Sequence, residues 1–214
     1  MSSQVRGGTR WKRFALVMVP SVAATAAVGV GLAQGALAAS FSVSGQSFKV
    51  SADYLDGYGF SQYGGIDTGY AEMEGDKKTV HPVAISSFRT AEITNMCQSV
   101  VTDIPGLGSV SLQLKAGGGG TPVHAENLYI DVADLKADAE FTNIDIGVAA
   151  KDASKGPDIK AGESIKENGF AQQADRAQLR NVKQTAWATT AGTFKLSGLH
   201  MSLHKGKGAG VECY

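Results

Sequence analysis

Strict alternation of apolar and polar residues is the feature that most constrains the fold of this chain. Residues 109–114, SVSLQL, place every apolar side chain on one side of an extended backbone, which is the period of a strand with one buried face. Similar patterns occur at 41–50, 80–102, 177–190 and 193–204, whereas 53–76 resembles turns and short strands. With 27 glycines and 5 prolines, the chain is predicted to be all-β: an antiparallel sheet, either sandwich-like or elongated and open.

A short unit recurs four times where such strands end. Its order is a small or polar residue, x, apolar, x, Asn or Gly, apolar; it recurs at residues 91–96, 139–144, 177–182 and, less closely, 194–199, and the first two copies are the most similar. Asn and Gly tolerate a positive φ, so the fifth position predicts a turn or bulge after which apolar residues change face. The units are 48, 38 and 17 residues apart, which excludes a regular solenoid. Two interpretations remain: an antiparallel sheet with similar strand endings, or an elongated sheet or open half-barrel of the kind that holds lipid in envelope transport proteins.

The last predicted strand, residues 193–204, gives the sharpest expectation. Two apolar residues precede Gly198 and three follow it with the opposite parity: Phe194 and Leu196, then Leu199, Met201 and Leu203. A strand buries both sets on one face only if its backbone skips a residue, and Gly198 is the residue able to do so. We therefore expect a kink at Gly198, all five apolar side chains buried, and His200 and His204 facing outward.

Residues 1–38 have the composition of an export signal. Four basic residues lie between Arg6 and Arg13, a run of 20 uncharged residues follows at 14–33, and residues 36–38, ALA, offer a cleavage site before Ala39. The run is also long enough to cross a bilayer, so an uncleaved membrane anchor is the alternative to a signal peptide. In both cases we expect an apolar helix separate from the domain. Residues 39–214 are then a single exported β domain with a polar surface loop near 151–176.

The net charge of the exported part limits the classes of partner that it can bind. The chain has 20 basic and 20 acidic residues, and 1–38 holds four of the basic and none of the acidic ones, which leaves a net charge of about −4 for the remainder. Nucleic-acid binding requires a basic face, so no nucleic-acid partner is expected. The partners expected are lipid, glycan or another envelope protein, together with the membrane itself if the N-terminal helix stays uncleaved.

Cys97 and Cys213 are the only cysteines. Export implies an oxidising compartment, where such a pair is usually bridged. The sequence therefore predicts a disulfide that ties the C-terminal end to the middle of the chain, with a reactive thiol or metal ligand as the alternative.

Aromatic residues gather early in the exported part: Tyr54, Tyr58, Phe60, Tyr63 and Tyr70. On an exported protein such a group can stack on sugar rings or contact lipid, so these are the candidate ligand-facing residues. Packing over the ends of the sheet is the alternative.

Catalytic motifs are missing from the sequence. It contains no Gly-x-Ser-x-Gly elbow of the α/β hydrolases, and residues 117–120, GGGG, lack the Lys-Ser/Thr that completes a phosphate loop. His200 and His204 would lie about 13 Å apart on a strand, too far to share one metal ion. We therefore assign no catalytic residue, and we expect no metal site and no cofactor.

Several stretches together resemble a family of small exported actinobacterial proteins of unknown function: residues 1–52, ITNMCQSVV, GGGGTPVHAENLYIDV, FTNIDIGVAAKD and KQTAWATTAGTFKLSGL. Members of that family often carry the label "cholesterol esterase". The resemblance covers nearly the whole chain and implies an envelope or secreted location, but it supplies no catalytic motif that maps onto these residues. The expected function is that of an extracytoplasmic binding or structural module, with a lipid or sterol ester hydrolase and a lipid carrier as alternatives.

Overall fold

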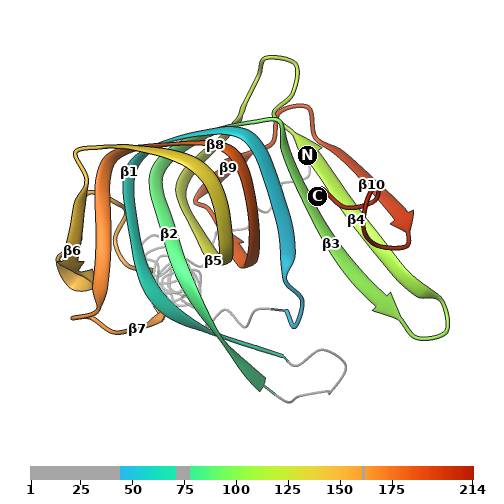
Figure 1. The fold of residues 1–214 in the computed structure, drawn as a ribbon, viewed down its shortest axis with the longest axis horizontal. Coiled ribbons are helices and arrows are strands. Elements are labelled where there is room, and N and C mark those ends of the chain that lie inside the picture. The colour runs from blue at the N-terminus through green and yellow to red at the C-terminus, as the bar shows by residue number, and fades with distance from the viewer. Residues whose placement is uncertain (1–43, 71–77, 161) are drawn as a thin grey trace, which may run out of the picture. The chain divides into compact units, whose positions relative to one another are not determined.

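The structure is a computed structural model that describes residues 44–70, 78–160 and 162–214. These residues form one antiparallel sheet of ten strands and a single 3-10 turn (Figure 1). In chain order the elements are β1 (Phe48–Tyr70), β2 (Lys78–Thr94), β3 (Met96–Ile104), β4 (Gly108–Ala116), β5 (Val123–Thr142), β6 (Asp145–Ala149), η1 (Ala150–Asp152), β7 (Ser164–Ile165), β8 (Phe170–Thr190), β9 (Thr193–Lys195) and β10 (His200–Lys205). The prediction of an all-β, antiparallel fold is confirmed.

Four long strands close on one another. β1 pairs with β2, β2 with β5, β5 with β8, and β8 with β1 again. These strands are 23, 17, 20 and 21 residues long, far above the usual length of about 5–6 residues. Figure 1 shows them bending sharply as they cross the top of the view. A closed sheet needs such coiled strands, and the bends have an identifiable cause in the sequence.

The recurring sequence unit marks bends in the backbone. Its fifth residue has a positive φ in all four copies, with values of 51° at Asn95, 53° at Asn143, 54° at Asn181 and 65° at Gly198. Each of the three asparagines also donates a side-chain hydrogen bond of 2.7 Å to an aspartate, the partners being Asp53, Asp175 and Asp138 respectively. The left-handed conformation costs Asn and Gly least among the amino acids. The prediction of a positive φ at this position is therefore confirmed.

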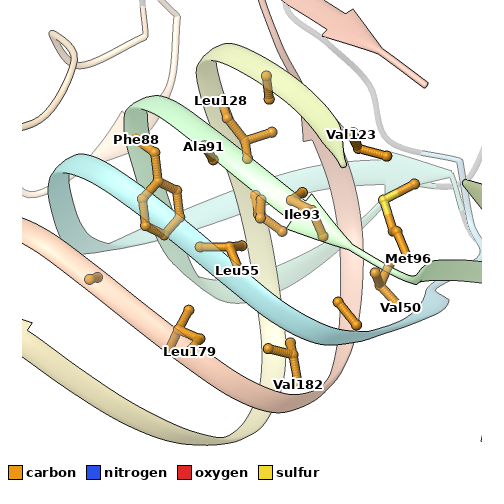
Figure 2. Close-up of a cluster of buried hydrophobic side chains, with 14 of the residues drawn as sticks. Val50, Leu55, Phe88, Ala91, Ile93, Met96, Val123, Leu128, Leu179 and Val182 are labelled. Carbon is orange, nitrogen blue, oxygen red and sulfur yellow. The ribbon is translucent and has the colours of Figure 1, made fainter. Parts of the chain in front are cut away.

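The main core lies inside the closed strands. Phe88, Val123, Leu128 and Ile93 are buried there together with Leu55 and Val182, and Figure 2 shows side chains from several strands converging on this interior. A smaller cluster lies on the other face of the sheet. Its centre is formed by Tyr63, Ile85 and Val83, and residues 150–160 and 162–165, which we name the covering segment, pack over it through Ala150, Ile159 and Ile165.

β3, β4 and β10 extend the sheet beyond its closed part, on the right of Figure 1. β3 continues β2 past the bend at Asn95 and pairs with β1 over three residues, Lys49 to Ser51. The C-terminal end is tied to this extension, because Cys97 of β3 and Cys213 form a disulfide with a Cα–Cα distance of 5.7 Å. The pairing predicted from the sequence is thus present.

Three local expectations differ from the structure. The segment expected as turns and short strands, 53–76, is mostly the single strand β1. The surface loop near 151–176 ends earlier, because β8 begins at Phe170. The kink at Gly198 exists, but burial of the residues beyond it was wrong: Leu199, Met201 and Leu203 are 48%, 58% and 71% exposed. The kink places these side chains on one face of the strand, but none of the described residues covers that face.

The expected apolar helix lies in residues 1–38, outside the part of the chain that the structure describes. Among the described residues, no helix has the length and apolar character needed to cross a membrane.

Candidate functional site

A cavity of about 190 Å³ lies inside the closed strands. Its apolar wall comes from all four long strands and includes Leu55 and Phe60 of β1, Phe88 of β2, Phe141 of β5 and Leu179 of β8. Phe60 is the centre of an aromatic group, with ring centroids 5.3 Å from those of both Phe88 and Phe141. The second half of β5 contributes alternate residues, Leu135, Ala137, Ala139 and Phe141, to the wall. Small alanines at two of these positions leave the space open.

A set of polar side chains lines part of the same cavity. Gln172 donates to the side-chain oxygen of Gln62, and Gln62 donates to Ser86 Oγ, each at 2.7 Å. These three side chains and Gln184 are the polar groups among the lining residues. An apolar cavity with a few fixed hydrogen-bonding groups is the usual composition of a small-molecule site.

Further hollows share walls with this cavity. A small one of about 30 Å³ shares Leu55, Ile130, Val182 and Gln184 with it. That hollow in turn shares Gln98, Thr189 and Phe194 with a wider one of about 480 Å³, whose other lining residues include Phe48 and Trp187. The three hollows therefore follow one another from the interior toward the junction with β3.

The other face of the sheet carries a group of buried acids beneath the covering segment. Asp131 of β5 is only 5% exposed. Its carboxylate is repelled by the negative charges of Asp67 of β1 and Glu163 of the covering segment. One side-chain oxygen of each of these three acids is buried and has no hydrogen-bond partner among the described residues. Glu163 also accepts a hydrogen bond of 3.0 Å from the Tyr63 hydroxyl.

Burial sets the protonation of this group. Desolvation, reinforced by the negative charges of Asp67 and Glu163, raises the pKa of Asp131 from 3.8 to about 7. Desolvation also raises the pKa of Asp67 and of Glu163, while Lys160 opposes the shift at all three acids. Among the described residues, no group of three or more His, Cys, Asp or Glu side chains is placed to hold a metal ion. The raised pKa of Asp131 makes the charge of this group of acids depend on pH near neutrality.

Asp131→Asn should stabilise the protein in alkaline solution. The folded-state pKa is raised above the unfolded value of 3.8, so the stability that Asp131 contributes is fully present below about pH 4 and is lost as the pH rises through about 7. Asparagine does not ionise, and its amide can donate to the neighbouring carboxylates. We expect the free energy of unfolding at about pH 8 to rise by about 1–3 kcal/mol, with no gain at about pH 4. Urea denaturation at both pH values measures this; an equal change at both would contradict it.

The candidate aromatic residues do not form one surface. Phe60 lies in the cavity wall, whereas Tyr63 is buried on the opposite face against Glu163. Tyr54 and Tyr58 lie beneath arginines of β8, with the guanidinium carbons of Arg180 and Arg176 at 5.3 and 5.0 Å from the ring centres. Tyr70 ends β1, and its side chain lies outside the described part. Of the four whose side chains the structure describes, only Phe60 lines the cavity.

Two histidines contact a hydroxyl group, which is one part of what the hydrolase alternative requires. Ser202 Oγ lies 2.9 Å from His204 Nε2, and Thr79 Oγ1 lies 2.9 Å from His81 Nε2; both are contacts between residues two apart on one strand. His81 is also stacked on Trp187, with ring centroids 3.6 Å apart. A serine hydrolase aligns a nucleophile, a base and a carboxylate near an oxyanion site. Within the described ranges, no carboxylate hydrogen-bonds to His204 or His81 to complete such an array.

Of the cavity residues, Phe60 was a candidate from the sequence; the others, and the buried acids as a group, were not identified from it. The sequence of 135–141 does predict a strand with one apolar face, because its apolar residues alternate with charged ones. The apolar residues are Leu135, Ala137, Ala139 and Phe141. That pattern identifies an inner face but does not show that a hollow lies beside it.

Comparison with known proteins gave one match. A model described as "Family of unknown function (DUF6230)" matches residues 44–214, which include every residue that the structure describes. No curated protein and no solved structure matches the chain.

Proposed function

Because the chain belongs to this family of unknown function, DUF6230, its role has to follow from its own geometry, and we propose that it is an exported module that binds an apolar chain, such as the acyl chain of a lipid, inside its closed sheet. The observation that carries this proposal is the cavity of about 190 Å³ among Leu55, Phe60 and Phe141. Export is supported by the sequence of residues 1–38 and by the disulfide, which suits an oxidising compartment.

The size of the cavity limits the ligand. An apolar cavity of about 150 Å³ admits a molecule such as benzene. A cavity of about 190 Å³ therefore accepts a ring or a short length of alkyl chain. The wider hollow of about 480 Å³ near Phe48 and Phe194 supplies room for the rest of a longer molecule.

The polar groups of the cavity suit a ligand that is mostly but not wholly apolar. Ser86 and Gln62 are already hydrogen-bonded to each other, and Gln62 also accepts from Gln172, so their polar atoms are partly satisfied without a ligand. A buried hydroxyl or carbonyl of a ligand can add to this set without leaving a protein group unpaired.

Filling the cavity should weaken binding. In Ala137→Phe, the new ring points into the cavity, so we expect the affinity of the full chain for a fluorescent fatty acid to fall at least tenfold. Ala133→Phe is the matched control, because Ala133 is exposed on the same strand and does not line the cavity. Titration by fluorescence, together with native mass spectrometry for co-purified lipid, provides the measurement. Equal affinity in both variants, or no lipid bound by the parent protein, would overturn the proposal.

A further inference from the structure

One face of the β3–β4–β10 extension is apolar across all three strands. Pairing places Leu203 of β10 opposite Leu112 of β4, and Leu112 opposite Val100 of β3. The next row joins Met201 to Leu114. Residues paired across an antiparallel sheet lie on the same face, so these side chains form a continuous surface.

This apolar face is open to solvent. Met201 and Leu203 are 58% and 71% exposed, and Leu107, at the tip of the β3–β4 hairpin, is 63% exposed. Beyond them, Leu199 and Ile104 are exposed large apolar residues of the same extension. The opposite face is covered instead: Ser99 and Ser111 are buried there and hydrogen-bond to the C-terminal segment, through Cys213 N and Gly206 O. A contiguous apolar patch of this kind marks an interaction site.

The open face continues the inner face of the closed strands. Leu114, Phe194 and Leu196 are partly buried and pack against the main core. Gln98, which pairs with Leu114, lines both the small inner hollow and the wider one. An apolar molecule resting on the open face is therefore next to the hollows that lead inward.

The charge around the face is positive, in contrast to the net charge of about −4 of residues 39–214. Lys205 follows Met201 and Leu203 with the same parity on β10 and therefore borders the apolar face. Lys195, which pairs with His124, and Lys207, which lies near Ser99 and Asp103, belong to the opposite face. Residues 193–211 contain no acid. Lys207 does lie 3.9 Å from Asp103, at the limit of an ion pair. Exposed apolar side chains with a lysine at their border and no acid in the same segment are complementary to a bilayer surface that contains anionic lipid.

The start of the described chain lies beside the same extension. Thr102 of β3 donates a hydrogen bond of 3.1 Å to the side-chain oxygen of Gln46. The apolar run at 14–33 ends about ten residues before the first described residue, Ser44. Ten residues span at most about 35 Å. Whether that run is retained or cleaved, the chain enters the domain next to the apolar face.

We propose that this face docks on the surface of an anionic phospholipid bilayer. Leu203, Met201 and Leu107 enter the acyl boundary, while Lys205 meets the headgroups. Docking depends on the exposed apolar face and its charge, and it does not require that the interior cavity bind lipid.

Site-specific quenching tests the proposal in the full chain. Leu203→Trp and Val80→Trp are prepared, because Val80 is 68% exposed but lies on β2, away from this face. Both variants are mixed with vesicles of equal phosphatidylcholine and phosphatidylglycerol, in which part of the lipid carries brominated acyl chains. We expect bromine to quench the tryptophan introduced at 203 several times more strongly than that introduced at 80, after subtraction of the parent signal from Trp11 and Trp187. Any contribution of residues 14–33 is the same in both variants.

A second experiment compares two variants in which an exposed apolar residue is replaced by a negatively charged one. Leu203→Glu should lower the vesicle-bound fraction several-fold relative to Ile146→Glu, which changes an equally exposed residue of β6, at 66%. Equal quenching at both positions, or equal binding of both glutamate variants, would overturn the proposal. A dimer in lipid-free solution that Leu203→Glu dissociates would also overturn it, because the face would then be covered by a second copy. If Ala137→Phe loses fatty-acid binding but still docks normally on vesicles, the interior cavity and the apolar face act as independent sites.

Discussion

Replacing Cys97 and Cys213 together by serine is expected to lower the free energy of unfolding by about 4–5 kcal/mol, because their disulfide closes a loop with a sequence separation of 116 residues. The loss arises mainly in the unfolded chain, which gains the freedom that the bridge removes. For a single domain of this size the loss is a large fraction of the total stability, which is typically about 5–15 kcal/mol.

Other contacts of the C-terminal end do not replace the bridge. Lys49 Nζ lies 2.7 Å from Glu212 and also donates to the carbonyl of Tyr214 at 3.1 Å, and it lies over the Tyr214 ring. These contacts join a strand of the closed part to the last residues, but partly exposed ion pairs contribute only about 0–1 kcal/mol each. Lys49→Ala should therefore cost far less than removal of the disulfide.

Urea denaturation of the parent protein, the double serine variant and Lys49→Ala measures the difference. The parent protein unfolded in the presence of a reductant is the control, and it should match the double serine variant. A loss below about 1 kcal/mol in that variant would mean that the unfolded chain is already restricted around this loop.

The backbone bends were accessible from the sequence, because their cause is local. An Asn or Gly at a fixed place in a short unit was enough to locate the positive φ at Asn95, Asn143, Asn181 and Gly198. Other described residues also have a positive φ, among them Gly59 of β1 and Asn127 of β5, at 62° and 47°, and the unit did not locate these. Local chemistry therefore identified four bends but missed those inside β1 and β5.

The missed bend at Gly59 explains why the aromatic group was misleading. Tyr58 and Phe60 have the same parity, so a regular strand would place them on one face. The bend between them leaves Tyr58 48% exposed and turns Phe60, at 3%, into the cavity. Grouping by closeness in sequence cannot detect such a change of face.

Closure of the sheet depends on contacts between distant segments. β1 pairs with β8 through residues such as Leu55 and Leu179, which belong to opposite ends of the domain. Alternation shows that each strand has an apolar face but not which strand it meets. The same limit accounts for the error beyond Gly198: the pattern located the apolar face of β10, whereas its exposure depends on what covers the β3–β4–β10 extension.

Phe88→Ala should lower the free energy of unfolding by about 3–5 kcal/mol. Phe88 is 1% exposed, and its ring lies 5.3 Å from that of Phe60 inside the closed strands. Phe88 already lines the cavity, so the void left by its ring would enlarge that cavity. The neighbouring side chains cannot move far enough to refill the space, which keeps the loss of stability large. Phe170→Ala is the matched control, because Phe170 is 64% exposed and should cost no more than about 0.5 kcal/mol.

A double-mutant cycle with Gly57 tests whether the ring is in the place described. A Cβ atom added at Gly57 would lie only 2.3 Å from the Phe88 ring, so Gly57→Ala alone should be destabilising through overpacking. Once the ring is absent the methyl group has room, and Gly57→Ala should then be tolerated or slightly stabilising in the Phe88→Ala background. Urea denaturation of the four proteins gives the coupling free energy, which we expect to be about 1–3 kcal/mol. Strictly additive losses would mean that Gly57 and Phe88 do not meet across the β1–β2 pair, and the register that closes the sheet would then be wrong.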